Sequence, residues 1–96
     1  MAPVAGDGIF QNTPNPFNPE TTIRFTLAEA GRAVLRVFNV RGELVNTLAD
    51  EWLASGEHVV RWNGRFASGA PAPSGVYYAR VSGRSYRGQI RMILLK

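Results

Sequence analysis

The side chains that could carry out chemistry are few, and their spacing does not build a catalytic centre. His58 is the only histidine, and the 96-residue chain has no cysteine. A thiolate metal site is therefore excluded, and no nucleophile pattern near His58 would make it a general base. Asp50, Glu51 and Glu57 form the one acidic cluster, and their spacing is not that of a calcium loop. We predict a chain that is not an enzyme and that uses no metal or cofactor.

Charge is distributed unevenly along the chain. All seven acidic residues lie within residues 1–60 together with four arginines, whereas residues 61–96 hold six arginines, Lys96 and no acid. An excess of this kind usually indicates an anionic partner such as nucleic acid, a membrane surface or an acidic polysaccharide. No recognition helix, zinc pattern or aromatic RNA-binding signature accompanies the charge. We therefore expect no nucleic-acid partner.

Four aromatic residues bear on ligand contact, and two of them are candidates for exposure. Trp62 lies in phase with the apolar residues of its segment, which indicates a core position. Tyr77 and Tyr78 are adjacent, so they must point to opposite faces of a strand. One of them is core, and Tyr78 is the candidate for exposure. Trp52, in a predicted loop, is the best candidate for an exposed aromatic.

Alternation of apolar and polar residues predicts short strands and no helix. The predicted strands span residues 22–27, 33–38, 43–48, 57–62, 76–81 and 86–95, with a marginal edge strand around residues 9–10. Residues 49–55 are predicted to be a loop because Gly56 interrupts the pattern. Val34 and Phe38 place apolar groups on the second face of their strand, which indicates a central position. Six or seven strands at intervals of about 8–12 residues, with turn residues between them, predict an all-β antiparallel sandwich.

The segment NTPNPFNPETT, residues 12–22, precedes the first clear strand. Its prolines have no N–H and force the residues before them into extended conformations. Phe17 is the one large apolar residue in the segment. We predict that the segment lies along a sheet edge, blocks further pairing there and inserts Phe17 into the core. A free proline-rich linker is the alternative.

The last predicted hairpin carries the candidate recognition residues. A two-residue turn at Gly83 and Arg84 would place Arg80 opposite Arg87, a like-charge pair that destabilises a sheet. The face opposite the core would then present basic and apolar groups together. The candidate recognition residues are Arg80, Arg87, Arg91, Ile93, Leu95 and Lys96. Either this face recognises a partner, or the segment 12–22 covers Ile93 and Leu95 while the arginines extend into water.

Five motifs, in order and with matching gaps, resemble those of one protein family. They are NTPNPFNPETTIRF from residue 12, VFNVRG from residue 37, GEHVVRWNG from residue 56, SGVYY from residue 74 and RMILLK from residue 91. The chain resembles the C-terminal sorting domain of the type IX secretion system, which is related to the immunoglobulin-like domain of flagellar hook-capping proteins. The resemblance implies an immunoglobulin-like sandwich over residues 12–96, with residues 1–11 as a linker or marginal edge strand.

The resemblance also implies a function. Members end longer secreted proteins, often hydrolases of polysaccharide or protein. Machinery in the outer membrane recognises the domain and exports the cargo, which is often anchored at the cell surface after cleavage by a sortase-like peptidase. We therefore expect a monomeric, non-catalytic module of a secreted, surface-attached protein. Its expected partners are the outer-membrane secretion machinery and an anionic surface polysaccharide.

Two departures from the family pattern concern charge. Asn39 and Asn63 stand where members often carry Asp, which removes carboxylates from any ion site there, and Arg91 stands where Lys is usual. Two other hypotheses stay open. A carbohydrate-binding module of a secreted glycanase would show two coplanar exposed aromatics in a groove, and a hook-capping-type assembly domain is the other. Core positions for Trp62 and one tyrosine would favour the sorting module.

Overall fold

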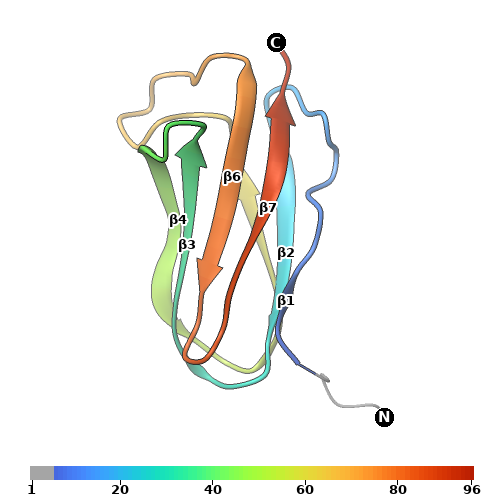
Figure 1. The fold of residues 1–96 in the computed structure, drawn as a ribbon, viewed down its shortest axis with the longest axis vertical. Coiled ribbons are helices and arrows are strands. Elements are labelled where there is room, and N and C mark those ends of the chain that lie inside the picture. Colours follow the sequence, from blue (N-terminus) through green and yellow to red (C-terminus); the bar gives the residue numbers. More distant parts are fainter. Residues whose placement is uncertain (1–5) are drawn as a thin grey trace.

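The computed structural model describes residues 6–96, which form a two-layer all-β sandwich (Figure 1). The strands are β1 (Gly8–Ile9), β2 (Thr21–Leu27), β3 (Gly31–Asn39), β4 (Leu44–Leu53), β5 (Gly56–Trp62), β6 (Gly75–Ser82) and β7 (Arg87–Leu94). One antiparallel sheet has the order β1-β2-β5 and the other the order β4-β3-β6-β7. The predicted all-β immunoglobulin-like sandwich is confirmed. No helix within residues 6–96 is long and apolar enough to cross a membrane.

The hydrophobic core lies between the inner faces of the two sheets. Buried and exposed residues alternate along β2, β3 and β6, as a sheet with one face on the core requires. The buried apolar side chains are Phe17, Ile23, Phe25, Leu27, Ala33, Leu35, Val37, Val45, Trp62, Ala72, Tyr77, Ala79, Val81, Met92 and Leu94. β3 is central, between β4 and β6, as predicted. The marginal strand predicted near the start is β1, and residues 1–5 lie outside the described part of the chain.

β4 continues further than the sequence predicted. The prediction of a loop at residues 49–55 is wrong, because β4 runs to Leu53 and remains paired with β3 over that length. Ala, Asp and Glu have low strand propensity, so pairing with β3 outweighs local preference here. A bidentate contact between Arg32 and Asp50, with distances of 2.9 and 3.0 Å, joins the two strands in this region.

The loop between β6 and β7 is longer than predicted, and this changes the register of the hairpin. Arg80 pairs with Gln89 instead of Arg87. The loop runs from Gly83 to Tyr86 and is closed by a hydrogen bond from the Gly83 N–H to the Tyr86 carbonyl (2.7 Å). The predicted pair of Arg80 and Arg87 is therefore wrong. Because the register differs by two residues, each side chain stays on the predicted face of its strand.

Residues 12–22, here called the proline strap, lie beside the edge of β7 that β6 leaves free (Figure 1). The Phe17 N–H donates to the Ile93 carbonyl, and the Leu95 N–H donates to the Phe17 carbonyl, both at 3.0 Å. The Ile93 N–H donates to Asn15 Oδ1 at 2.9 Å. The strap thus occupies the hydrogen-bonding groups that an additional strand would use. The prediction of a segment docked on a sheet edge is confirmed.

Phe17 joins the strap to the core. Its ring centroid lies 5.6 Å from that of Trp62, which lies 5.2 Å from that of Tyr77 in an edge-on arrangement. The Trp62 indole N–H donates to the Arg65 carbonyl (3.0 Å), and the Tyr77 hydroxyl donates to the Pro73 carbonyl (2.6 Å). A tyrosine bonded to a carbonyl just upstream is typical of the tyrosine corner of immunoglobulin-like sandwiches. The predicted core positions of Trp62 and one tyrosine are confirmed.

A small polar network joins the beginning of the strap to its last two residues, which are also the first two residues of β2. The Asn12 side chain is buried and donates to Thr21 Oγ1 (3.0 Å) and to the Pro14 carbonyl (3.1 Å). The Thr21 hydroxyl donates to the same carbonyl at 2.8 Å. Thr13 and Thr22 exchange backbone hydrogen bonds of 3.0 and 2.9 Å. Because these buried groups are all paired, the network holds the strap without leaving a polar atom unsatisfied.

Gly64 allows the strap to approach the turn after β5. Its φ is +73°, and a Cβ atom at this position would lie 2.7 Å from the Pro19 carbonyl oxygen. Both the backbone conformation and the close contact require glycine.

Replacing Phe17 tests how much the docked strap stabilises the domain. Phe17→Ala should lower the free energy of unfolding by about 3–5 kcal/mol, because it empties an enclosed aromatic position. Phe10→Ala is the matched control, since Phe10 is 40% exposed and packs against the guanidinium of Arg24. The control should lose no more than about 1 kcal/mol. Urea unfolding followed by tryptophan fluorescence measures both. Equal losses would show that the strap is not held through Phe17.

A second test uses Tyr77. Burial raises the pKa of its hydroxyl above the usual value. The unfolded chain therefore releases this proton at a lower pH than the folded chain, so the stability that Tyr77 contributes declines as the pH rises above about 10. Tyr77→Phe should lose about 1 kcal/mol at neutral pH with its hydrogen bond to Pro73. It should also show a shallower alkaline decline in denaturant titrations. Parallel declines in the two proteins would contradict this assignment.

Candidate functional site

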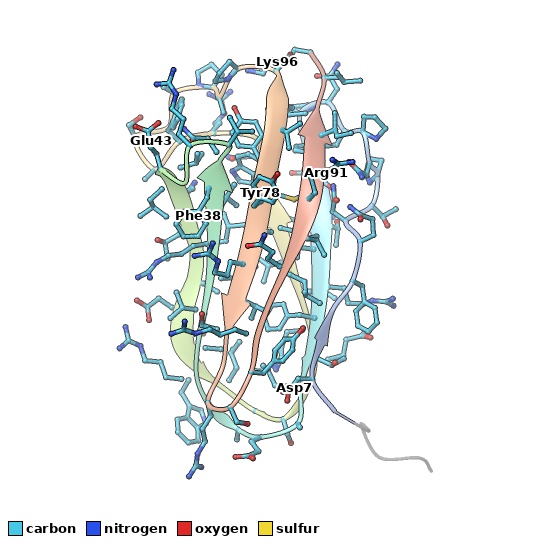
Figure 2. The ribbon with its side chains drawn as sticks, in the orientation of Figure 1. Asp7, Phe38, Glu43, Tyr78, Arg91 and Lys96 are labelled. Carbon is cyan, nitrogen blue, oxygen red and sulfur yellow. The ribbon has the colours of Figure 1, made fainter. Side chains whose placement is uncertain are left out.

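The outer face of the β4-β3-β6-β7 sheet, which faces the viewer in Figures 1 and 2, carries a group of arginines. Arg36 of β3, Arg80 of β6, and Arg87 and Arg91 of β7 all alternate with inward-pointing residues and are exposed. We call these four residues the basic face. The tertiary pairing of three strands brings together charges that lie far apart in the sequence.

Cross-strand register places two of these arginines side by side. Arg36 lies directly opposite Arg80, an arrangement of like charges that costs stability. The Arg80 guanidinium carbon is 4.5 Å from the Phe38 ring centre, and the group donates to Gln89 Oε1 at 3.3 and 3.4 Å. Arg36 Nε lies 3.4 Å from Thr47 Oγ1. These neutral neighbours orient the guanidinium groups without neutralising them.

Four carboxylates are held in ion pairs by arginines outside the basic face. In the described part of the chain, the ion pairs are Arg24–Glu57, Arg32–Asp50, Arg61–Glu20 and Arg84–Glu29. Asp50 is the acid opposite Val34 on the outer side of the sheet, and Arg32 holds it at 2.8 Å. No ion pair within residues 6–96 includes a member of the basic face. The face therefore keeps its positive charge.

A hollow opens between the arginines. Its volume is about 180 Å³, and its lining residues are Val34, Arg36, Phe38, Arg80, Ser82 and Arg87. A second hollow of about 240 Å³ shares two of these arginines and is lined by Arg80, Arg87, Gly88 and Gln89. Guanidinium and hydroxyl groups donate the hydrogen bonds that oxyanions accept. The arrangement is suited to holding an anion.

The basic residues predicted from the sequence come together in part. Arg80 and Arg87 both border the hollow. They lie diagonally across from each other on neighbouring strands and are not directly opposite. Arg91 lies further along β7, opposite Tyr78. Figure 2 labels Phe38, Tyr78 and Arg91, which form one row across β3, β6 and β7. The strand order thus extends the predicted site from one hairpin to three strands.

The other predicted recognition residues lie away from the hollow, where the strap meets β7. Ile93 is half-buried, and its backbone is bound by the strap. Leu95 is 52% exposed, so the alternative in which the strap covers both apolar residues fails for Leu95. The strap binds the Leu95 N–H, and the side chain remains outside. The Lys96 N–H donates to Ser74 Oγ at 2.9 Å.

Arg36 and Ser82 line the hollow but were not predicted as site residues. The alternation around Arg36 already indicated that its side chain points outward. What the sequence did not contain was the pairing of β3 with β6, because no short turn connects these strands. The register of two strands that are distant in sequence is set by core packing.

The two candidate aromatics lie on different strands of the same sheet. Trp52 is 69% exposed, as predicted, but it belongs to β4 and not to a loop. Tyr78 is half-buried on β6, with Phe38 and Arg91 opposite it on the two neighbouring strands. None of the aromatic pairs in the described part of the chain includes Trp52. Among the described residues, Trp52 therefore has no second aromatic ring packed against it.

His58, the one side chain considered for catalysis, contacts a backbone carbonyl and an aromatic ring. His58 Nε2 lies 2.7 Å from the Ala54 carbonyl, and its ring centroid is 5.5 Å from that of Phe25. Across residues 6–96, no three His, Asp or Glu side chains gather where they could hold a metal ion.

Asn39 and Asn63 organise turns. Asn39 Oδ1 accepts the backbone N–H groups of Arg41 (2.9 Å) and Glu43 (3.0 Å). Asn63 Oδ1 accepts the Arg65 N–H at 3.2 Å. Short polar side chains commonly stabilise turns in this way.

Known proteins share this sequence pattern and this fold. The FlgD Ig-like domain family matches residues 12–86. Dimeric latent PorU from Porphyromonas gingivalis is 18% identical with a TM-score of 0.67, over 96% of this chain and 10% of PorU. PorZ, an essential bacterial surface component of the type IX secretion system of the same organism, is 24% identical with a TM-score of 0.60, over 95% of this chain and 12% of PorZ.

FlgD from Pseudomonas aeruginosa is 22% identical with a TM-score of 0.58, over 78% of this chain and 59% of FlgD. No curated protein matches the chain in sequence. At these identities the structural likeness shows the fold alone, and the chain spans less than two thirds of each of these solved structures. The family match covers most of the chain, including the strap, strands β2 to β6 and the β6–β7 loop. The chain belongs to the FlgD Ig-like domain family.

Proposed function

We propose that this chain is a non-catalytic C-terminal module of a larger secreted protein, a hydrolase, and that it directs type IX secretion and attachment to the cell surface. The observation that carries the proposal is the resemblance of five ordered motifs to type IX sorting domains, and the structural alignments accompany it. PorU and PorZ align with 96% and 95% of the chain, whereas FlgD aligns with 78%. The family match stops at residue 86, before β7 begins. The last of the five motifs, RMILLK, lies in the part of the chain beyond this family match, and it supports the type IX module over the hook-capping domain.

The structure suggests how such a module would present its recognition elements. The strap fixes the outer edge of β7, so that strand cannot pair with another chain. Leu95 and Lys96 follow β7 and are exposed. We propose that this end contacts the outer-membrane secretion machinery, while the basic face meets an anionic surface polysaccharide. We propose that the module acts as a monomer, and the strap supports this by closing the edge of β7 to pairing with another chain.

A hook-capping-type assembly domain is the second candidate, and the match to the FlgD Ig-like family favours it. A carbohydrate-binding module for neutral glycans has less support, because Trp62 and Tyr77 are core residues and Trp52 is exposed alone. The two remaining candidates differ in what the chain does to a fused protein. Only a sorting module carries a reporter to the cell surface.

An export assay therefore tests the proposal. A periplasmic reporter with residues 1–96 at its C-terminus should become accessible to external protease in a type IX-competent host. The immunoglobulin-like domain of P. aeruginosa FlgD, fused through the same linker, is the matched control and should leave the reporter inside. A reporter that stays in the periplasm with this chain, or that is exported with either domain, would contradict the proposal.

Point substitutions in the same assay locate the export signal. Removing residues 92–96 would also remove the buried Met92 and Leu94, so loss of export could reflect unfolding. Leu95→Gln with Lys96→Gln avoids this, and it should reduce export while leaving the melting temperature unchanged. Leu44→Gln with Arg41→Gln is the matched control, because Leu44 is 55% exposed and Leu95 is 52% exposed. Similar loss of export in both double variants would remove the terminal residues from the proposal.

A further inference from the structure

We propose that the hollow bordered by Arg36, Arg80, Arg87 and Ser82 binds a sulfate or phosphate group carried by an anionic polysaccharide. The choice of a polysaccharide rests on the proposed function at the cell surface, and the inference deepens that function by naming the site. Arg36 and Ser82 come from parts of the sheet that the predicted recognition hairpin does not include.

The first argument is electrostatic. Arg36 and Arg80 lie directly opposite each other, and no carboxylate among the described residues pairs with either. A like-charge pair of this kind lowers the stability of the sheet. An anion held between the two guanidinium groups removes the repulsion and gains charge-assisted hydrogen bonds. Conflicts between local stability and packing are expected at functional sites.

The second argument is the shape and donor content of the hollow. A volume of about 180 Å³ suits one compact group. Val34 and Phe38 contribute apolar surface to the lining, and the donors come from three arginines and the Ser82 hydroxyl. Guanidinium forks match oxyanions that offer several acceptor oxygens in different directions. A sulfate or phosphate group engages more of these donors at once than a carboxylate with its two oxygens.

The third argument concerns what carries the group. The second hollow of about 240 Å³ continues from the first over Gly88 and Gln89. Arg91 lies further along the same face of β7, about 13 Å from Arg87 by strand geometry. A linear polyanion lying along β7 can therefore present one charged group to the hollow and another to Arg91. The face is an open sheet with no helix or ribbon to enter a nucleic-acid groove.

The test measures binding of dextran sulfate to the 96-residue chain by calorimetry, with uncharged dextran of the same length beside it. The variant Arg36→Gln, Arg80→Gln, Arg87→Gln should bind dextran sulfate about tenfold more weakly or worse. The matched control is Arg24→Gln, Arg61→Gln, Arg84→Gln, which loses the same charge from sites that have acidic partners. The control should weaken binding by no more than about threefold.

Thermal unfolding supplies a readout that does not depend on the polymer. Arg36→Gln alone should raise the melting temperature at low salt, because it removes the repulsion with Arg80. Sodium sulfate should stabilise the unmodified chain more than the Arg36→Gln variant at equal ionic strength, since only the former keeps the complete site. A folded Arg36→Gln variant that is no more stable than the parent, and that sulfate stabilises to the same extent, would contradict the proposed anion site.

Other outcomes also overturn the inference. Equal weakening in the two triple variants would mean that binding reflects net charge and not the hollow. Tighter binding of duplex DNA or of phosphatidylglycerol vesicles, lost in the Arg36, Arg80 and Arg87 variant, would assign the hollow to a different partner.

The export assay gives a cellular test of the same triple variant. A reporter that carries it should reach the exterior but be released into the medium, and retention at the surface would count against the inference. Failure of the unmodified chain to export its reporter would count against the proposed function alone, because the calorimetric result stands by itself.

Discussion

The contact between the proline strap and β7 is the constraint on which the rest of the structure depends. β7 is the last strand of its sheet, and only β6 pairs with it within that sheet. The strap supplies the missing partner through Phe17, whose backbone bonds to Ile93 and Leu95 and whose ring packs against Trp62. Because prolines cannot donate hydrogen bonds, the strap satisfies β7 and offers few donors to another chain. One segment therefore completes the core, closes the sheet edge and fixes the strand that carries Arg87 and Arg91.

The two faces of the four-stranded sheet differ in how their polar and charged groups are paired. On the inner face, apolar side chains fill the sandwich and the polar ends of Trp62 and Tyr77 are hydrogen-bonded. On the outer face, Arg36 and Arg80 oppose each other without an acid between them. The strand register fixes where the two side chains start, and contacts with Phe38, Gln89 and Thr47 orient their guanidinium groups in the absence of an anion. Such preorganisation lowers the ordering cost of binding.

Alternation predicted much of this fold, because a residue's face depends only on local parity. It placed Trp62 in the core and made β3 central, whereas Phe17 was predicted as the one large apolar residue of the proline segment, and these predictions are confirmed. It failed where pairing between strands decides the outcome. β4 extends through residues of low strand propensity because β3 holds them, and the β6–β7 loop proved longer than a Gly-based turn suggested. For the same reason the sequence identified Arg80 and Arg87 but not Arg36, whose place at the hollow depends on long-range pairing.

Amide hydrogen exchange measured by NMR tests the central claim, that the strap is an integral part of the sandwich, most directly. The Phe17 and Leu95 N–H groups bond only across the junction of strap and β7. If this junction opens only when the domain unfolds, both amides should exchange with the slow rates of core amides in β3. Exchange of both amides at the rate of an unstructured peptide, with β3 still protected, would show that the strap detaches freely and would contradict the account.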